Sequence, residues 1–256
     1  MRIMAIFSIL ALLICTACVP VANRSSEGGS EQQKAKNRAR IHAELGAAYY
    51  SAGRYSFAID ELKEALKSDP SYIAAINQLG LVYLALGQEP QAMAQLERAL
   101  KIDPNDSSVN NNYGMLLCRK GQHKDGLSHL RKALADPLYQ SPETAHVNAG
   151  ICLKGSGDSV QAESMFRKAL ALSPNQAEAL YQLAELSFAK GDLASARDFI
   201  TRHGRAIEPN VEALWLAARV ENGLGNRNAL ATYGAQLNRR FPDAVQTRSF
   251  NEGRFQ

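Results

Sequence analysis

The sequence predicts an all-α fold in which about six helix pairs stack into one elongated superhelix. Residues that favour helices, mainly Ala, Leu, Gln, Glu, Lys and Arg, dominate the 256-residue chain. EALKSDP at 64–70 returns as RALKIDP at 98–104, as KALADP at 132–137 and as KALALSP at 168–174, with a period of 34 residues. A turn glycine recurs in each unit. Because each helix pair buries its apolar face only against its neighbours, such an array forms one continuous solenoid.

The composition excludes several classes of protein. Hydrophobic residues make up 46% of the chain and charged residues 21%, which is typical of a folded domain. A mostly disordered chain, a collagen-like chain and a protein with many membrane spans are therefore excluded. The formal net charge is +4, which is a weak bias over this length, so we expect no nucleic-acid partner.

Residues 1–17 have the pattern of a signal peptide. Met1 and Arg2 give a positive end, and the apolar run at 3–14 is too short to span a bilayer comfortably. Ala17 before Cys18 resembles the lipobox of bacterial lipoproteins. That resemblance implies cleavage before Cys18 and a covalent lipid on its sulfur, although Cys15 stands where the family has Leu. The alternative is an ordinary secretory signal without a lipid.

Residues 18–38 are predicted to form a lipidated cysteine and a flexible tether. The stretch VPVANRSSEGGSEQQKAKN at 19–37 is polar, contains Gly and Ser and has no apolar periodicity. Such a tether spans about 25 Å. Val19, rather than Asp, follows Cys18, and the resemblance to Gram-negative lipoproteins therefore implies the outer membrane, on its periplasmic face.

From residue 39 onward, each unit has the pattern of two closely packed helices. Small residues recur at positions 8 and 20, and bulky apolar residues recur at positions 7, 11 and 24. This spacing resembles the tetratricopeptide repeat (TPR) family, which implies a right-handed superhelical solenoid. The repeats are expected at about 39–72, 73–106, 107–142, 143–176, 177–210 and 211–242, followed by a C-terminal tail at 243–256.

The resemblance also implies a concave groove lined by the first helix of each repeat. Amides at Asn77 and Asn111 could bind the backbone of an extended peptide, and the apolar residues nearby could take its side chains. Alternatively, the two asparagines form local hydrogen bonds between helices. The groove candidates are Tyr50, Asn77, Leu81, Asn111, Met115 and Arg119.

Phe57 is a second candidate for partner contact. It stands at position 19 of the first repeat, where the corresponding residues of the next four repeats are Gln91, Asp125, Gln161 and Ser195. A phenylalanine at an otherwise polar position indicates an exposed apolar contact. We expect Tyr50 and Tyr55 to extend this surface. The alternative is that Phe57 packs under the N-terminal tether, because terminal repeats are atypical.

Two cysteines remain in the repeats, Cys118 and Cys152. They lie on the first helices of neighbouring repeats, and their repeat positions differ by two, which is about 200° around a helix. That phase difference suits a bond between facing helices, so a structural disulfide is expected. Two free, buried thiols are the alternative.

No pattern in the chain indicates catalysis. HExxH, GxGxxG and GxSxG motifs are absent from the sequence, and the histidines stand at unrelated repeat positions. We therefore expect a protein that is not an enzyme and that carries no metal and no cofactor apart from the lipid on Cys18. The histidines are His42, His123, His129, His146 and His203.

The combination of features resembles one lipoprotein family. The chain resembles the type IV pilus biogenesis family PilF/PilW in its lipobox, short tether, six repeats and pair Cys118/Cys152. Three stretches are also similar to that family: YYSAGRYSFAIDELKEAL, NNNYGMLLCRKGQ and AGICLKGSGD. The resemblance implies a pilotin that helps the PilQ-type secretin reach the outer membrane and multimerise, for pilus assembly and twitching motility. We expect the chain itself to be monomeric. A TPR scaffold lipoprotein of another envelope complex, such as the β-barrel assembly machinery, is the alternative.

Overall fold

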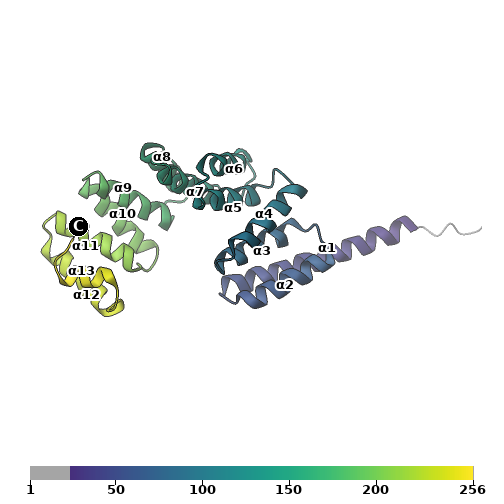
Figure 1. The fold of residues 1–256 in the computed structure, drawn as a ribbon, viewed down its shortest axis with the longest axis horizontal. Coiled ribbons are helices and arrows are strands. Elements are labelled where there is room, and N and C mark those ends of the chain that lie inside the picture. Colours follow the sequence, from purple (N-terminus) through teal and green to yellow (C-terminus); the bar gives the residue numbers. More distant parts are fainter. Residues whose placement is uncertain (1–23, 256) are drawn as a thin grey trace, which may run out of the picture.

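The protein is described here by a computed structural model that covers residues 24–255, with side chains from Ser30 onward. All regular structure in this part of the chain is helical (Figure 1). The predicted signal peptide and Cys18 lie outside the described residues. The helices are α1 Arg24–Ser51, α2 Tyr55–Ser68, α3 Ile73–Ala85, α4 Glu89–Ile102, α5 Ser107–Arg119, α6 His123–Ala135, α7 Pro142–Gly155, α8 Ser159–Leu172, α9 Ala177–Ala189, α10 Leu193–Ala206, α11 Val211–Gly223, α12 Arg227–Arg240 and α13 Val245–Asn251.

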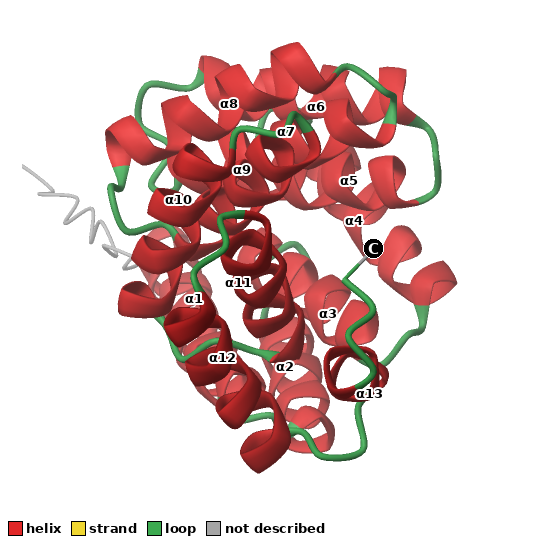
Figure 2. Ribbon diagram, turned by 90° about the vertical axis from the view of Figure 1, so that its left-hand side faces the viewer, coloured by secondary structure: helices red, strands yellow, loops and turns green. Residues whose placement is uncertain are grey.

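Helices α1 to α12 form six consecutive pairs that stack into a superhelical solenoid, as the sequence predicts (Figures 1 and 2). Within each pair, a short turn joins the two helices. Its glycine has a φ angle between 69° and 88°, a left-handed conformation that side chains with a Cβ rarely adopt. The turn glycines are Gly53, Gly87, Gly121, Gly157, Gly191 and Gly225.

Small residues allow the two helices of a pair to approach closely. A Cβ added to Gly150 would lie 2.5 Å from the ring of the fully buried Phe166. In the third pair both contacting residues are glycines, and a Cβ on Gly114 would lie 2.8 Å from the carbonyl oxygen of Gly126. The small residues of the 34-residue pattern therefore mark the positions where the two helices come closest, and its bulky residues mark the buried positions.

The flexible tether predicted at 18–38 is wrong for residues 24–38, because α1 begins at Arg24 and continues into the first pair. This stretch has no apolar face, and for that reason the sequence pattern did not indicate a helix. It is rich in residues with high helix propensity, and Lys34 pairs with Glu31 at 2.8 Å one turn away. Figure 1 shows this part of α1 extending beyond the end of α2.

The segment predicted as a C-terminal tail contributes to the fold. It contains α13, which covers the last pair, and Phe250 fills the space above Gly234. The buried Thr247 hydroxyl donates to the carbonyl oxygen of Phe241 at 2.6 Å. Helix α13 thus caps the open end of the array, where a seventh pair would otherwise stack.

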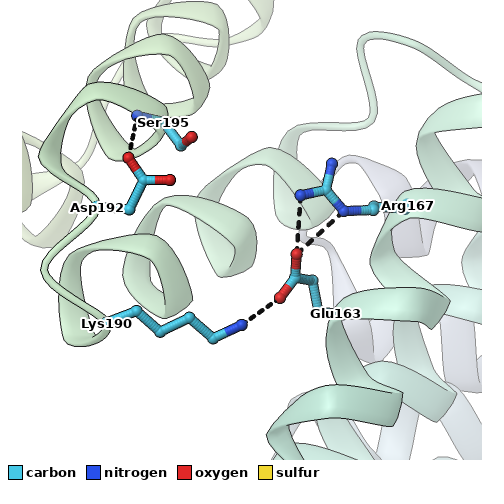
Figure 3. Close-up of polar contacts among 5 residues, drawn as sticks. All are labelled: Glu163, Arg167, Lys190, Asp192 and Ser195. Atoms are coloured by element: carbon cyan, nitrogen blue, oxygen red, sulfur yellow. Dashed lines mark hydrogen bonds and ion pairs between the residues drawn. The ribbon is translucent and has the colours of Figure 1, made fainter.

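Polar contacts tie neighbouring pairs together away from the core (Figure 3). Glu163 on α8 accepts hydrogen bonds from Arg167 one turn away, at 2.8 and 3.1 Å, and from Lys190 at the end of α9. These two cations hold the pKa of the Glu163 carboxyl below its usual value. Asp192 caps α10 by accepting from the Ser195 amide at 3.0 Å.

Candidate protein-binding surfaces

The N-terminal end of the array exposes large apolar side chains. Ile41, Leu45 and Tyr49 follow one another at four-residue spacing on α1, so they share one face of that helix. Ile41 is 54% exposed and Leu45 41%. In the inner pairs, the residue equivalent to Leu45 packs against the preceding pair, as buried Leu79 does. The first pair has no preceding pair among the described residues, which leaves this face uncovered.

Phe57 adjoins this face from α2 and is 48% exposed. Its ring lies 5.4 Å from that of Tyr49, centroid to centroid, and the Arg54 guanidinium lies 4.2 Å above the Phe57 ring. The structure therefore places Phe57 at the surface. We define the N-terminal face as Ile41, Leu45, Tyr49, Arg54 and Phe57.

The two tyrosines expected to extend the Phe57 surface lie elsewhere. Tyr50 and Tyr55 pair with each other, with ring centroids 5.9 Å apart. Both are half-buried and pack against the core of the first pairs. The tyrosine that contacts Phe57 is Tyr49, which is also half-buried against this core.

The asparagines predicted for peptide binding form a chain of amide hydrogen bonds along three first helices. Asn148 of α7 donates to Asn111 of α5 at 2.9 Å, Asn111 donates to Asn112 at 3.1 Å, and Asn112 donates to Asn77 of α3 at 2.9 Å. Asn111 is only 4% exposed. This geometry agrees with the alternative of local helix–helix hydrogen bonds, because the amides satisfy one another.

The other predicted groove residues lie on the same helices. Leu81 of α3 and Met115 of α5 are half-buried. Arg119 is exposed at the end of α5, with its guanidinium 3.6 Å from a carboxylate oxygen of Glu89. The structure thus brings Leu81 and Met115 beside the amide chain, and it places Arg119 in a loose ion pair.

Cys118 and Cys152 form a disulfide between α5 and α7, with their Cα atoms 5.2 Å apart. His123 lies beside it, its Nδ1 atom 3.8 Å from the Cys152 sulfur. A disulfide leaves neither sulfur as the thiolate that binds a metal. This bond covalently joins the third and fourth pairs.

The shifted pKa values in the described residues follow from burial in a helical array. Burial lowers the pKa values of His129, His146 and His203, and it raises those of Tyr113 and Tyr139 to about 12. Tyr113 and His129 contact each other within the third pair, with ring centroids 4.9 Å apart, whereas His146 and His203 lie on α7 and α10.

The inner face of the last pairs carries two residues that the sequence reasoning did not select, Trp215 and Arg219. They stand one turn apart on α11, and Phe188, which occupies groove position 12 of the fifth repeat, stands on α9 opposite Arg219. Trp215 and Arg219 occupy repeat positions 5 and 9, which are groove positions in the TPR family. Extending the groove positions to the degenerate sixth repeat could have identified them.

Comparisons with known proteins define the class of this chain. A model of the tetratricopeptide repeat family matches residues 49–113 and 153–220, and the chain therefore belongs to that family. No helix in the described part of the chain has the length and apolar character needed to cross a membrane.

The chain is also homologous to two proteins of type IV pilus biogenesis. The crystal structure of PilW, a type IV pilus biogenesis factor, is 30% identical, with a TM-score of 0.74 over 82% of this chain and 97% of PilW. The structure of Pseudomonas aeruginosa PilF is 26% identical, with a TM-score of 0.76 over 87% of this chain and 99% of that chain. In sequence, 115 residues align with the type IV pilus assembly protein PilF of that organism at 26% identity; they are 45% of this chain and 46% of PilF.

Proposed function

We propose that this chain is an outer-membrane lipoprotein that acts as a pilotin in type IV pilus biogenesis. It promotes outer-membrane localisation and multimerisation of the pilus secretin, and thereby pilus assembly and twitching motility. The observation that carries this proposal is the similarity to PilW across 97% of that chain. It is supported by homology to PilF, whose alignment spans less than half of the curated protein.

The mechanism is binding without a chemical step. The lipid on Cys18 would hold the protein at the periplasmic side of the outer membrane. The N-terminal face would bind a secretin segment with apolar side chains, because burying Ile41, Leu45 and Phe57 removes apolar area from water. Arg54, stacked over Phe57, adds a cation beside the apolar contact. An amphipathic segment with acidic residues at its edge fits this combination.

A deletion strain tests the proposal. Membranes are fractionated and blotted for secretin, and heat-resistant multimer is compared with monomer. The expected result is loss of multimer, with monomer stranded in the inner membrane, and restoration by the wild-type gene. Unchanged multimer in the outer membrane would overturn the pilotin proposal. Depletion of many β-barrel proteins would instead favour a scaffold of the barrel assembly machinery.

A further inference from the structure

The inner face of the last pair is occupied by residues from the end of the chain. After α13, Gly253 adopts a φ of 68° and the following residues turn toward the inside of the coil (Figure 2). There the Phe255 ring stacks on Trp215, with centroids 5.7 Å apart and planes 18° apart. Arg219 Nε donates a hydrogen bond to the Phe255 carbonyl oxygen at 3.2 Å. Trp215 thus holds this segment by the Phe255 ring, and Arg219 holds it by the main-chain carbonyl group.

A cavity opens beside Arg219, the residue that binds the Phe255 carbonyl oxygen. The Arg219 guanidinium lies 4.5 Å from the centre of the Phe188 ring, on the side of that cavity. Among the described residues, Arg219 is in no ion pair, so its guanidinium retains capacity for an acceptor. The cavity has a volume of about 350 Å³ and is lined by Lys154, Glu185, Leu186, Phe188, Ala189, Leu216 and Arg219.

Phe255 is attached less firmly than Phe250. Phe250 packs over Gly234 so closely that a Cβ on the glycine would lie 2.0 Å from its ring. Phe255, by contrast, is held by Trp215, by the edge of Phe250 at 5.7 Å and by one hydrogen bond from Arg219. A segment with so few contacts opens easily, so another segment with the same groups can compete for its place.

We propose that the groove over Trp215, Arg219 and Phe188 is a second protein-binding site, which takes an extended peptide bearing an aromatic side chain. Phe255 occupies it when no partner is bound. The partner's ring stacks on Trp215, its main-chain carbonyl accepts from Arg219, and its next side chain enters the cavity beside Phe188. This site lies at the opposite end of the array from the N-terminal face and does not depend on the pilotin proposal.

Trp215 is the only tryptophan of the chain, so its fluorescence reports on this site alone. The probe is a synthetic peptide with residues 251–256, NEGRFQ, and its control has alanine in place of phenylalanine. The protein is full-length wild type, Phe255→Ala, or Phe255→Ala combined with Arg219→Ala. We expect Phe255→Ala to bind the peptide about tenfold more tightly than wild type. The double variant should bind it about tenfold more weakly than Phe255→Ala. The control peptide should not bind.

Two outcomes would overturn the proposal. If Phe255→Ala lowers the melting temperature but leaves Trp215 emission unresponsive to the peptide, the segment is a structural cap only. If the two peptides bind with equal affinity, the site does not recognise the aromatic ring. A circular dichroism melt of each variant shows whether the last pairs remain folded during the titration.

Discussion

At position 57, a single side chain distinguishes the first pair from the others. Phe57 is 48% exposed, and its ring contacts Tyr49 and Arg54 rather than the core. Phe57→Ala should therefore weaken secretin association by at least about tenfold, while the free energy of unfolding changes by less than about 1 kcal/mol. Co-purification of secretin and a urea denaturation curve measure the two effects.

The matched control for Phe57 is Val160→Ala, which truncates a side chain that is 78% exposed on α8, outside the N-terminal face. It should change neither secretin association nor stability. Normal secretin multimers in the Phe57→Ala strain would show that the N-terminal face is not the secretin-binding surface.

His203 stands at a repeat position where the first four repeats have alanine. It is 5% exposed, and its Nδ1 atom has no hydrogen-bond partner among the described residues. Burial lowers its pKa, with Glu178 opposing the shift. A lowered pKa means that the folded state favours the neutral ring, so His203 stabilises the fold above its unfolded pKa, and this stability is lost as the pH falls.

His203→Ala restores the residue of the first four repeats, and it should reduce the loss of melting temperature between pH 7.5 and pH 5. Because His129 and His146 also have lowered pKa values, part of the pH dependence should remain. Thermal melts at both pH values measure it. Parallel curves for wild type and variant would contradict the role assigned to His203.

At the scale of helices, two arginines, each on the second helix of a pair, form ion pairs that differ in burial. Arg197 of α10 binds Glu221 of α11 through two hydrogen bonds of 2.8 Å, and Glu221 is 5% exposed. Arg167 of α8 binds Glu163, which also pairs with Lys190 (Figure 3). Loss of Arg197 leaves a buried carboxylate unpaired, whereas loss of Arg167 leaves Glu163 with Lys190.

Arg197→Ala should therefore lower the free energy of unfolding by about 2–3 kcal/mol, because an unpaired buried charge is costly. Arg167→Ala should lower it by less than about 1 kcal/mol, as expected for an exposed pair. Urea denaturation of both variants in the same buffer gives the comparison. Equal losses would mean that the burial of Glu221 has no energetic consequence.

The disulfide between α5 and α7 should stabilise the array by restricting the conformations of the unfolded chain. It connects residues 34 apart in sequence, so its removal should cost about 2–4 kcal/mol. Cys118→Ala combined with Cys152→Ala should lower the urea midpoint accordingly. A reductant should lower the midpoint of the wild type to a similar extent and leave that of the double variant unchanged. A reductant effect on the double variant would point to another cause.

The inner helices were predictable from sequence, and the terminal ones were not. Helices α3, α5 and α9 begin at Ile73, Ser107 and Ala177, the residues from which the repeats are counted. Periodicity detects helices that bury a face. The first part of α1 buries almost none, and α13 lies outside the repeat, so neither gives this signal. Hydrogen bonds between helices were the alternative for Asn77 and Asn111, but the part played by Asn112 and Asn148 was not predictable, because it depends on contacts between helices of different pairs.

The exposure of Phe57 was predictable because one residue departed from its equivalents in the other repeats. The docking of Phe255 on Trp215 was not predictable, because the end of the chain folds back over its own array. A contact of this kind is set by tertiary packing and not by local sequence. The repeat pattern can therefore identify Trp215 and Arg219 as groove residues, whereas only the structure shows that Phe255 covers them.

Over the whole molecule, stability should be highest in the middle of the array. A solenoid is held mainly by contacts between neighbours, and an inner pair has two neighbours where an end pair has one. The disulfide and the amide chain add links at α5 and α7. Hydrogen exchange should accordingly be slowest in α5 to α8 and fastest in the first turns of α1 and in α12 and α13. Uniform protection across all pairs would contradict this gradient.

The helical extension of α1 fixes how the N-terminal face is oriented relative to the residues that precede Arg24. The fifteen residues from Arg24 to Arg38 span about 22 Å at 1.5 Å per residue, and each residue turns the helix by about 100°. The residues before Arg24 are thus connected to the array through a helix, which fixes the rotation between them. Removing seven residues, about two turns, shortens this helix but preserves the orientation of the N-terminal face about the helix axis. Removing two residues rotates that face by about 200°, slightly more than half a revolution.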